Sequence, residues 1–174
     1  MKKLVLFLIP SALLFSTCIG QQKFNKPEVK AESIIFKCER INDPSSKTIG
    51  IHNKSNYLEE SQKNHFGELL NNIQLLNRTK FTEAFWNAFG EVKLKELLPE
   101  RNIPITFYIN KTGKIIELSY ILKKNTLITP RELEKLENNI IKNVSFRLRP
   151  EEIVKGDYFF LVMNTNFQKI VNKD

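Results

Sequence analysis

A strand, a tight turn and a second strand between residues 103 and 122 constrain the fold more than any other stretch of this sequence. Apolar residues alternate with more polar ones on both sides of the turn, which is the period of half-buried strands. The expected inward residues are Ile103, Ile105, Phe107 and Ile109 on the first strand, and Ile116, Leu118, Tyr120 and Leu122 on the second. Gly113 supplies the positive φ that the turn at 110–113 needs. The pattern predicts an antiparallel hairpin.

A helix with a complete start signal follows the hairpin. Thr129 is the expected N-cap, Pro130 takes the first turn, and Glu132 stands where it closes a capping box. The helix is expected over 130–143, with an inner stripe of Leu133, Leu136, Ile140 and Val144. A third strand is expected over 158–167, and its first six residues are almost continuously apolar, which indicates cover on both faces.

The first half of the chain is less sharply patterned. It predicts a strand over 32–39, a long loop over 40–57, and a helix over 58–76. A second helix is expected over 80–98, ended by Pro99. Its apolar stripe is Phe81, Ala84, Phe85, Ala88, Phe89 and Val92. Trp86 falls off this stripe, so it either covers a second layer of the core or faces a partner.

The order of these elements predicts an α+β fold, with an antiparallel sheet and helices packed on one face. We expect one domain over 32–174, preceded by a mobile lead-in over 21–31. Within the domain, 32–99 holds a strand, a loop and two helices, and 100–168 holds a strand-strand-helix-strand unit.

The first twenty residues have the layout of a secretory signal peptide: a basic start, a short apolar run and small residues before the cut. We place the cut between Gly20 and Gln21, and we expect a periplasmic or secreted protein of a Gram-negative bacterium. A lipoprotein signal that modifies Cys18 and holds the protein at the outer membrane is an alternative, although Phe15 and Thr17 fit that pattern poorly. An uncleaved anchor is a third interpretation, but the apolar run is too short for a permanent span. The mature chain is expected to have no transmembrane segment.

Charge does not indicate a nucleic-acid partner. The formal net charge is +8, and loss of Lys2 and Lys3 with the leader lowers it to +6. The lysines are spread along the chain, without the clustered footprint that nucleic acids need. A solvated basic surface is the preferred interpretation.

The sequence carries no readable catalytic chemistry. Cys38 is the single cysteine left after the leader, so no internal disulfide forms, and we expect this thiol to be a small buried hydrophobe. His65 and Glu68 are spaced to meet on a helix, but zinc needs three or four ligands. No phosphate loop or nucleophile motif occurs. We therefore predict no catalytic, cofactor or metal site.

The second half resembles the C-terminal domain of the TonB family. The resemblance rests on four segments: the alternating strand and Asn-Lys-x-Gly turn at 105–115, the helix at 130–143, the segment with an aromatic, a basic residue and Pro at 144–150, and a last strand ending Asn166-Phe167. The likeness covers residues 97–168. Phe146 stands where that family commonly has Trp, and neither the retained membrane helix nor the Pro-rich spacer is present. A chain without them cannot transmit force from an inner-membrane motor, so the resemblance implies an exported relative of the fold.

Two functions remain open. The first is an exported, non-catalytic binding module whose protein or peptide partner adds a strand to a sheet edge, as the resemblance implies for the final strand. The expected partner-binding residues are Tyr158, Phe160, Val162 and Trp86. A homodimer, a peptide or the chain's own strand around 34–36 would cover that edge. The alternative is an exported enzyme with a site assembled from scattered carboxylates and Tyr, Asn or Lys side chains.

Overall fold

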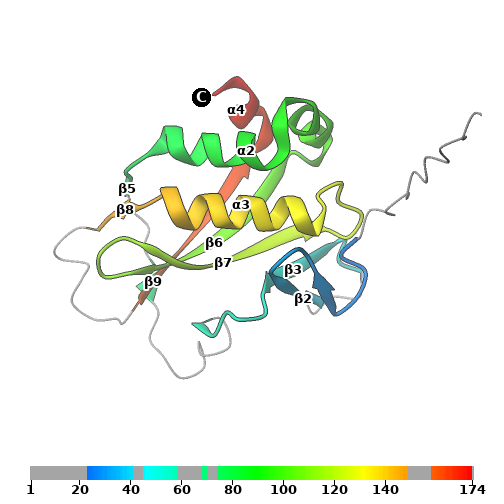
Figure 1. Ribbon diagram of the computed structural model, residues 1–174, viewed down its shortest axis with the longest axis horizontal. Coiled ribbons are helices and arrows are strands. Elements are labelled where there is room, and N and C mark those ends of the chain that lie inside the picture. The colour runs from blue at the N-terminus through cyan, green and yellow to red at the C-terminus, as the bar shows by residue number, and fades with distance from the viewer. Residues whose placement is uncertain (1–22, 41–44, 59–67, 70–73, 149–157, 174) are drawn as a thin grey trace, which may run out of the picture.

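The computed structural model describes residues 23–40, 45–58, 68–69, 74–148 and 158–173. Within them, seven strands form one sheet in the order β1-β2-β3-β7-β6-β9-β4, and every neighbouring pair is antiparallel except β9 and β4. The strands are β1 (Glu28–Lys30), β2 (Ile35–Arg40), β3 (Thr48–Asn53), β4 (Glu68–Leu69), β6 (Asn102–Asn110), β7 (Ile115–Lys123) and β9 (Tyr158–Asn166) (Figure 1). A second pairing joins β5 (Gln74–Leu75) to β8 (Phe146–Arg147).

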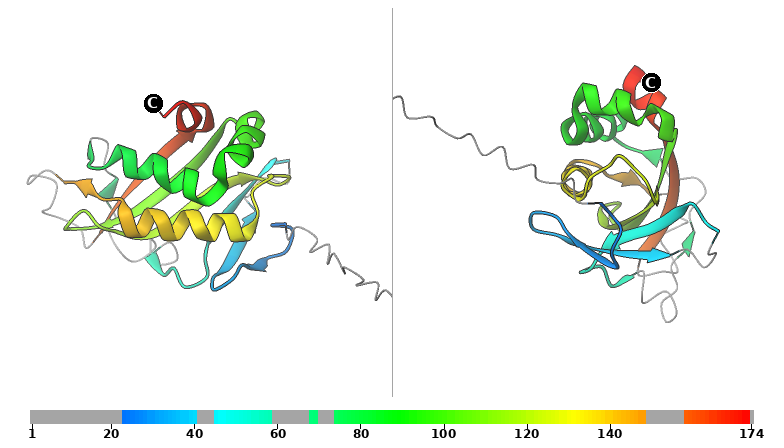
Figure 2. Two further views of the ribbon diagram at one scale, coloured as in Figure 1. Left: turned by 45° about the horizontal axis from the view of Figure 1, so that its top comes forward. Right: turned by 90° about the vertical axis from the view of Figure 1, so that its right-hand side faces the viewer.

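Helices cover one face of this sheet. They are α2 (Arg78–Leu97), α3 (Pro130–Asn143) and the short α4 (Phe167–Asn172), with a 3-10 turn η1 (Leu98–Glu100) after α2. Figure 2 shows α2 and α3 side by side on the same side of the curved sheet. The predicted α+β class, an antiparallel sheet with helices on one face, is confirmed.

The central hairpin forms as its alternation predicts. The inward residues of β6 are fully buried, and Gly113 has a φ of 80° in the turn. The expected inward position of Ile116 is wrong: a register shift after Tyr108 pairs Ile109 with Ile115, and Ile115 enters the main core instead. Ile116 packs with a smaller cluster on the opposite face of the sheet. A bulge moves one residue out of phase, which alternation alone cannot reveal.

The helix α2 contains a break that the apolar stripe did not predict. Gly90 has φ 71° and ψ 170°, so two helical segments meet there at a kink. The stripe up to Phe89 is buried, but Val92 is 74% exposed because the kink resets the helical phase. Leu94 and Leu97 are the buried residues of the second segment. The helix ends before Pro99, as expected.

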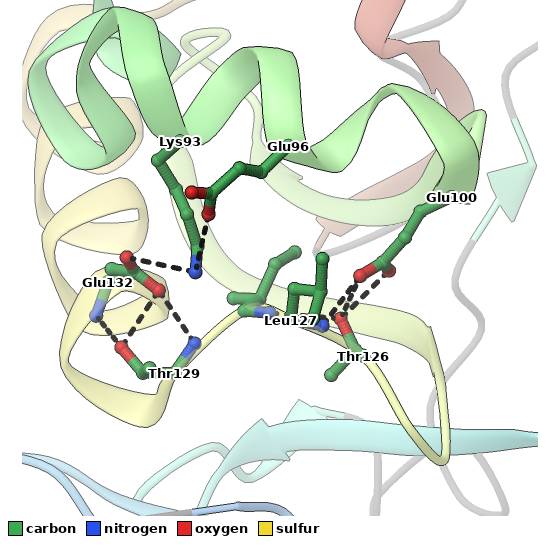
Figure 3. Close-up of polar contacts among 8 residues, drawn as sticks. Lys93, Glu96, Glu100, Thr126, Leu127, Thr129 and Glu132 are labelled. Carbon is green, nitrogen blue, oxygen red and sulfur yellow. Dashed lines mark hydrogen bonds and ion pairs between the residues drawn. The ribbon is translucent and has the colours of Figure 1, made fainter. Parts of the chain in front are cut away.

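The start of α3 matches its sequence signal. Thr129 accepts a hydrogen bond from the Glu132 backbone N–H, and the Glu132 carboxylate accepts one from the Thr129 N–H at 2.8 Å, which makes a capping box. Figure 3 shows that Lys93 of α2 reaches Glu132, with 3.8 Å between Nζ and Oε1. The same contact region holds Glu100, whose carboxylate accepts from Thr126 and from the backbone N–H of Leu127. The N-terminal end of α3 is thus tied to the C-terminal part of α2.

Two expectations for the first segment are wrong. Residues 23–31 are not a mobile lead-in, because β1 pairs with β2 and Phe24 is buried with its ring 6.0 Å from that of Phe36. The loop expected over 40–57 contains β3, which lies between β2 and β7. Ile49 and Ile51 are its buried residues. Two isoleucines on either side of a glycine are a weak local signal for a strand. β3 forms because the neighbouring strands β2 and β7 pair with it.

The helix expected over 58–76 is also wrong in its described parts. Residues 68–69 form β4 beside β9, and residues 74–75 form β5 beside β8. Strand partners supplied by the rest of the fold override the helical spacing of the apolar residues there. The leader over 1–20, His65 and Pro150 lie outside the described residues.

The end of the chain contains a helix that the sequence reading missed. The final strand stops at Asn166 rather than at Phe167, because the Asn166 side chain accepts a hydrogen bond from the Lys169 N–H at 3.2 Å and caps α4. Phe167 and Ile170 of α4 are buried, and the Phe167 ring lies 6.4 Å from that of Phe85. This short helix therefore packs on α2 beside the end of β9.

Candidate functional site

The second edge of β9 is only partly covered in the described part of the chain. β6 pairs with β9 along its whole length, from Tyr158 to Asn166. On the other side, β4 pairs with Phe159 and Phe160 alone. Residues 161–166 therefore have a strand partner on one side and none on the other among the residues that the structure describes. The chain's own strand around 34–36 does not cover this edge, because β2 pairs with β1 and β3 farther along the sheet.

The side chains of β9 differ in what they offer a partner. Tyr158 is 2% exposed and packs against Tyr108, with 6.0 Å between ring centroids, so its side chain is not accessible to a partner. Phe160 is half-buried against the same cluster. Val162 is 51% exposed and lies within the uncovered stretch. Burial thus leaves Val162 as the accessible member of the three residues predicted on this strand.

A groove lies beside this uncovered stretch, between β9, α2, α4 and β5. It consists of two adjoining cavities of about 380 and 440 Å³ that share Arg78 and Thr82 as lining residues. We name it the β9 groove. The first cavity is lined by Arg78, Thr79, Thr82, Glu83, Trp86 and Lys173. The second is lined by Gln74, Leu75, Arg78, Phe81, Thr82, Met163, Asn164, Thr165, Asn166, Lys169 and Ile170. Both volumes lie in the range of small-ligand and side-chain pockets.

Positive charge dominates the β9 groove. Arg78, Lys169 and Lys173 line it, and no carboxylate of the described residues lies within 4.0 Å of their charged nitrogens. Glu83, the acidic residue in the lining, is paired with Lys80 at 2.7 Å. The groove therefore presents three positive charges that have no ion-pair partner among the described residues, although the charge of Lys173 also acts on Glu91.

Trp86 packs partly against the main core and also lines the first cavity, and its role in binding a partner stays a prediction. Its Nε1 donates a hydrogen bond to the Ile170 carbonyl oxygen at 3.0 Å, and its ring packs partly against the main core. The rest of the side chain lines the first cavity, where the Lys173 Nζ lies 5.0 Å from the ring centroid. This cation–π contact holds a positive charge over the exposed part of the ring.

Thr165 adds a polar atom without a partner at the wall of the groove. Its side chain is 7% exposed, lines the second cavity, and its Oγ1 has no hydrogen-bond partner. A buried hydroxyl without a partner costs free energy, and such groups are rare in folded proteins. Its neighbour Asn166 already uses its side-chain oxygen to cap α4.

A second polar group lies in the interior, between α3 and the sheet. Glu137 is 2% exposed, and its Oε1 accepts a hydrogen bond from Asn53 Nδ2 at 3.1 Å. Burial raises the pKa of Glu137 to about 7, against the opposing effect of the Asn53 hydrogen bond. Tyr120 is 1% exposed. Its burial is the larger cause, and the nearby charge of Glu137 the smaller one, that raise the pKa of Tyr120 far above its usual range. The Tyr120 hydroxyl and the Glu137 Oε2 are not in hydrogen-bonding geometry.

Two neighbouring carboxylates hold loops in place. Glu134 accepts hydrogen bonds from the backbone N–H groups of Glu32 and Ser33 and from the Ser33 hydroxyl. These bonds outweigh the effect of burial and lower the pKa of Glu134. Glu117 accepts from the N–H groups of Tyr57 and Leu58, at 3.0 and 3.1 Å. Burial raises the pKa of Glu117 in spite of these bonds.

The remaining chemistry of the described chain is sparse. It contains no group of three or more His, Cys, Asp or Glu side chains that could hold a metal ion. Cys38 is a free, half-buried thiol, and burial raises its pKa to about 11, so it is a weak nucleophile at neutral pH. No helix among the described residues is long and apolar enough to span a membrane.

Trp86 is the one groove residue that the sequence analysis named, and the basic residues of the groove were not found from the sequence, although one signal was present. The first turn of α2 has no acidic residue and begins with Arg78, which is unfavourable next to the positive end of a helix dipole. Such a position indicates that the basic residue has another role. Lys169 and Lys173 gave no signal, because they belong to a helix that the sequence reading missed.

Comparisons with known proteins give information about the fold alone. No family model and no curated protein sequence matches this chain. The crystal structure of a DUF5043 family protein from Bacteroides uniformis ATCC 8492, at 1.85 Å resolution, is similar to it with a TM-score of 0.62. That match covers 84% of this chain and 89% of the other at 15% sequence identity. At this identity, the likeness shows the fold alone.

Proposed function

We propose that this protein is an exported, non-catalytic binding module. An extended segment of a protein or peptide partner adds as a strand to β9, along residues 161–166. Strand addition uses the main-chain N–H and C=O groups of an edge strand, so it requires no particular side-chain chemistry in the receiving protein. This fits a chain in which the sequence shows no catalytic motif.

The observation that carries the proposal is the uncovered stretch of β9 beside a groove. Among the described residues, the pairing of β4 with β9 ends at Phe160, and the lining of the β9 groove on β9 begins at Met163. An added strand would form ladder hydrogen bonds with the edge, and its side chains on one face would enter the groove. Affinity would come from the backbone and selectivity from the groove.

The topology supports the proposed relation to the TonB C-terminal domain. The elements β6, β7, α3 and β9 occur in the strand-strand-helix-strand order on which the resemblance rests. β9 lies beside β6, with β7 on the other side of β6. In the family resembled, the last strand of this unit is the edge that receives a partner's extended segment.

The enzymatic alternative has less support. Glu137, Tyr120 and Asn53 are the carboxylate, tyrosine and asparagine that such a site would combine. However, Glu137 and Tyr120 are only 2% and 1% exposed, and neither lines a described cavity. A substrate would have no path to these groups without a change of conformation.

Export belongs to the same proposal. We propose that residues 1–20 are a signal peptide, with the cut between Gly20 and Gln21, and that the protein works in the periplasm or outside the cell. The intact mass of the exported protein is then expected to begin at Gln21, with or without cyclisation to pyroglutamate. A diacylglycerol-modified Cys18 at the N-terminus would replace this account with outer-membrane lipidation.

Strand addition is tested by placing proline on the edge. A display library of random 12-residue peptides is selected against the wild-type protein, and the binders are measured against Val162→Pro and Met163→Pro. Adjacent N–H groups on a strand point to opposite sides, so one of these prolines removes an outward donor and the other breaks pairing with β6. Circular dichroism and thermal unfolding identify the variant that keeps its fold.

The two outcomes separate clearly. We expect the folded proline variant to lose peptide binding, while Lys111→Pro, in the turn of the β6–β7 hairpin, serves as a control away from the edge. A library that yields no binder, or binders unaffected by the folded β9 variant, would contradict strand addition.

A further inference from the structure

We infer that the partner segment is acidic, with carboxylates spaced along an extended chain that pair with Arg78, Lys169 and Lys173. This inference rests on the proposed function, because it specifies the chemistry of the segment that adds to β9. It assigns the β9 groove as the part of the protein that selects the partner.

The charge arrangement is the first reason. Arg78 comes from the start of α2, whereas Lys169 and Lys173 come from α4, so two elements far apart in sequence bring positive charge to one groove. Among the described residues, none of the three has a carboxylate within ion-pair distance. The planar guanidinium of Arg78 can bind a carboxylate through two parallel hydrogen bonds.

The start of α2 adds to the same field. Its N-cap residue, Asn77, makes no side-chain capping hydrogen bond, and the first turn holds no acidic residue. The N–H groups at the start of a helix carry partial positive charge and favour an anion. Thr79 of this turn lines the first cavity beside Arg78. The uncapped end of α2 therefore reinforces the attraction for a carboxylate.

The distribution of the charges favours a peptide over a single phosphate group. Arg78 lines both cavities, Lys173 lines the first, and Lys169 lines the second. A phosphate site usually gathers backbone N–H groups in a glycine-rich loop, and no glycine lines either cavity. Alternate side chains of an extended chain lie about 6 to 7 Å apart on one face, so an extended acidic segment can present carboxylates at more than one point along the groove.

The groove also offers apolar and polar contacts between the charges. Leu75, Phe81 and Met163 line the second cavity and can receive an apolar side chain of the partner. The buried Thr165 hydroxyl lies at the same wall without a hydrogen-bond partner. The expected partner sequence therefore alternates acidic and apolar residues on the face that enters the groove.

The test reads the composition of selected peptides. Random 12-residue peptides are selected in parallel against the wild-type protein, against Arg78→Gln/Lys169→Gln, and against Lys135→Gln/Lys142→Gln. The last double variant makes the same change in charge on the exposed face of α3. One enriched peptide and its Glu→Gln, Asp→Asn counterpart are then titrated, with the fluorescence of Trp86 as signal, because Trp86 is the only tryptophan and lines the groove.

We expect the wild-type protein and the α3 control to enrich acidic residues to about twice their frequency in the library. The Arg78→Gln/Lys169→Gln variant is expected to lose this enrichment and to bind the acidic peptide about fivefold more weakly or worse. Binders with no excess of acidic residues, but still sensitive to proline on β9, would overturn this inference and leave strand addition standing. Equal weakening by both double variants would also overturn it, because net charge alone would then explain the binding. A library without binders would contradict the proposed function itself.

Discussion

The buried carboxyl of Glu137 makes the stability of this fold depend on pH, in a direction that can be worked out. Its pKa is about 7 in the folded protein, against 4.5 for an ordinary glutamate, because burial disfavours the ionised form. Between these two values the folded state keeps a proton that the unfolded state releases. The free energy of unfolding therefore falls as pH rises from about 4.5 to about 7, by about 3 kcal/mol from this group alone.

Glu137→Gln removes this dependence while it keeps the shape of the side chain. Glutamine can still accept the hydrogen bond from Asn53, and its amide has no charge to bury. We expect the variant to match the wild-type protein near pH 4.5 and to be more stable by up to about 3 kcal/mol at pH 8. Other groups, Glu117 and Glu134 among them, also titrate, so the quantity to follow is the difference between the two proteins.

The assay is urea unfolding monitored by circular dichroism at intervals from pH 4.5 to pH 8.5. Glu96→Gln is the control for the loss of an exposed carboxylate, because the Glu96 side chain is 55% exposed and pairs with Lys93 at 3.7 Å. If the Glu137→Gln difference stays flat, or shrinks as pH rises, then the carboxyl is not buried in the way described and the reasoning is wrong.

Three further outcomes follow from local geometry. Thr129→Ala is expected to lower the free energy of unfolding by about 1 kcal/mol, measured by urea unfolding, because it removes one half of the capping box of α3. Gly113→Ala is expected to cost about 2 kcal/mol or more in the same assay, since its φ is 80° and an added Cβ would lie 1.9 Å from the Phe146 carbonyl oxygen. Lys111→Ala in the same turn should change little. Cys38 is expected to react slowly with a disulfide reagent at pH 8 and rapidly in urea, because burial raises its pKa to about 11; fast reaction in the native protein would contradict that burial.

The elements with strong local signals could be predicted from the sequence. The β6–β7 hairpin and α3 have a period, a turn glycine and a capping box that agree with one another, and the structure forms them at the expected places. Agreement between local signals is what makes a segment predictable without knowledge of its neighbours.

The elements that depend on neighbours could not be predicted. β3 carries two isoleucines around a glycine and forms because β2 and β7 pair with it on both sides. β4 and β5 are two residues each and exist only as partners of β9 and β8. The wrong prediction that Val92 is buried has a different cause. The non-helical backbone of Gly90 kinks α2, so the buried face after the kink no longer continues the apolar stripe before it.

In the candidate site, too, some features could be predicted from the sequence and others could not. The final strand was expected as an edge from its place in the resemblance, and β9 has an uncovered stretch among the described residues. The gathering of positive residues in one groove could not be expected, because α2 and α4 come together only in three dimensions. The burial of Tyr158 was also hidden, since its packing partner Tyr108 lies on the outward face of β6.

Amide hydrogen exchange along β9 tests the central claim most directly. In the free protein, we expect the N–H groups of residues 161–166 to alternate between slow exchange, where they pair with β6, and fast exchange, where they face the open edge. Addition of a peptide selected from the library should slow the fast set and leave exchange in β2 and β3 unchanged. Uniformly slow exchange over 161–166 in the free protein, or peptide-induced protection elsewhere with none in β9, would contradict the account of this chain as a module that binds by strand addition.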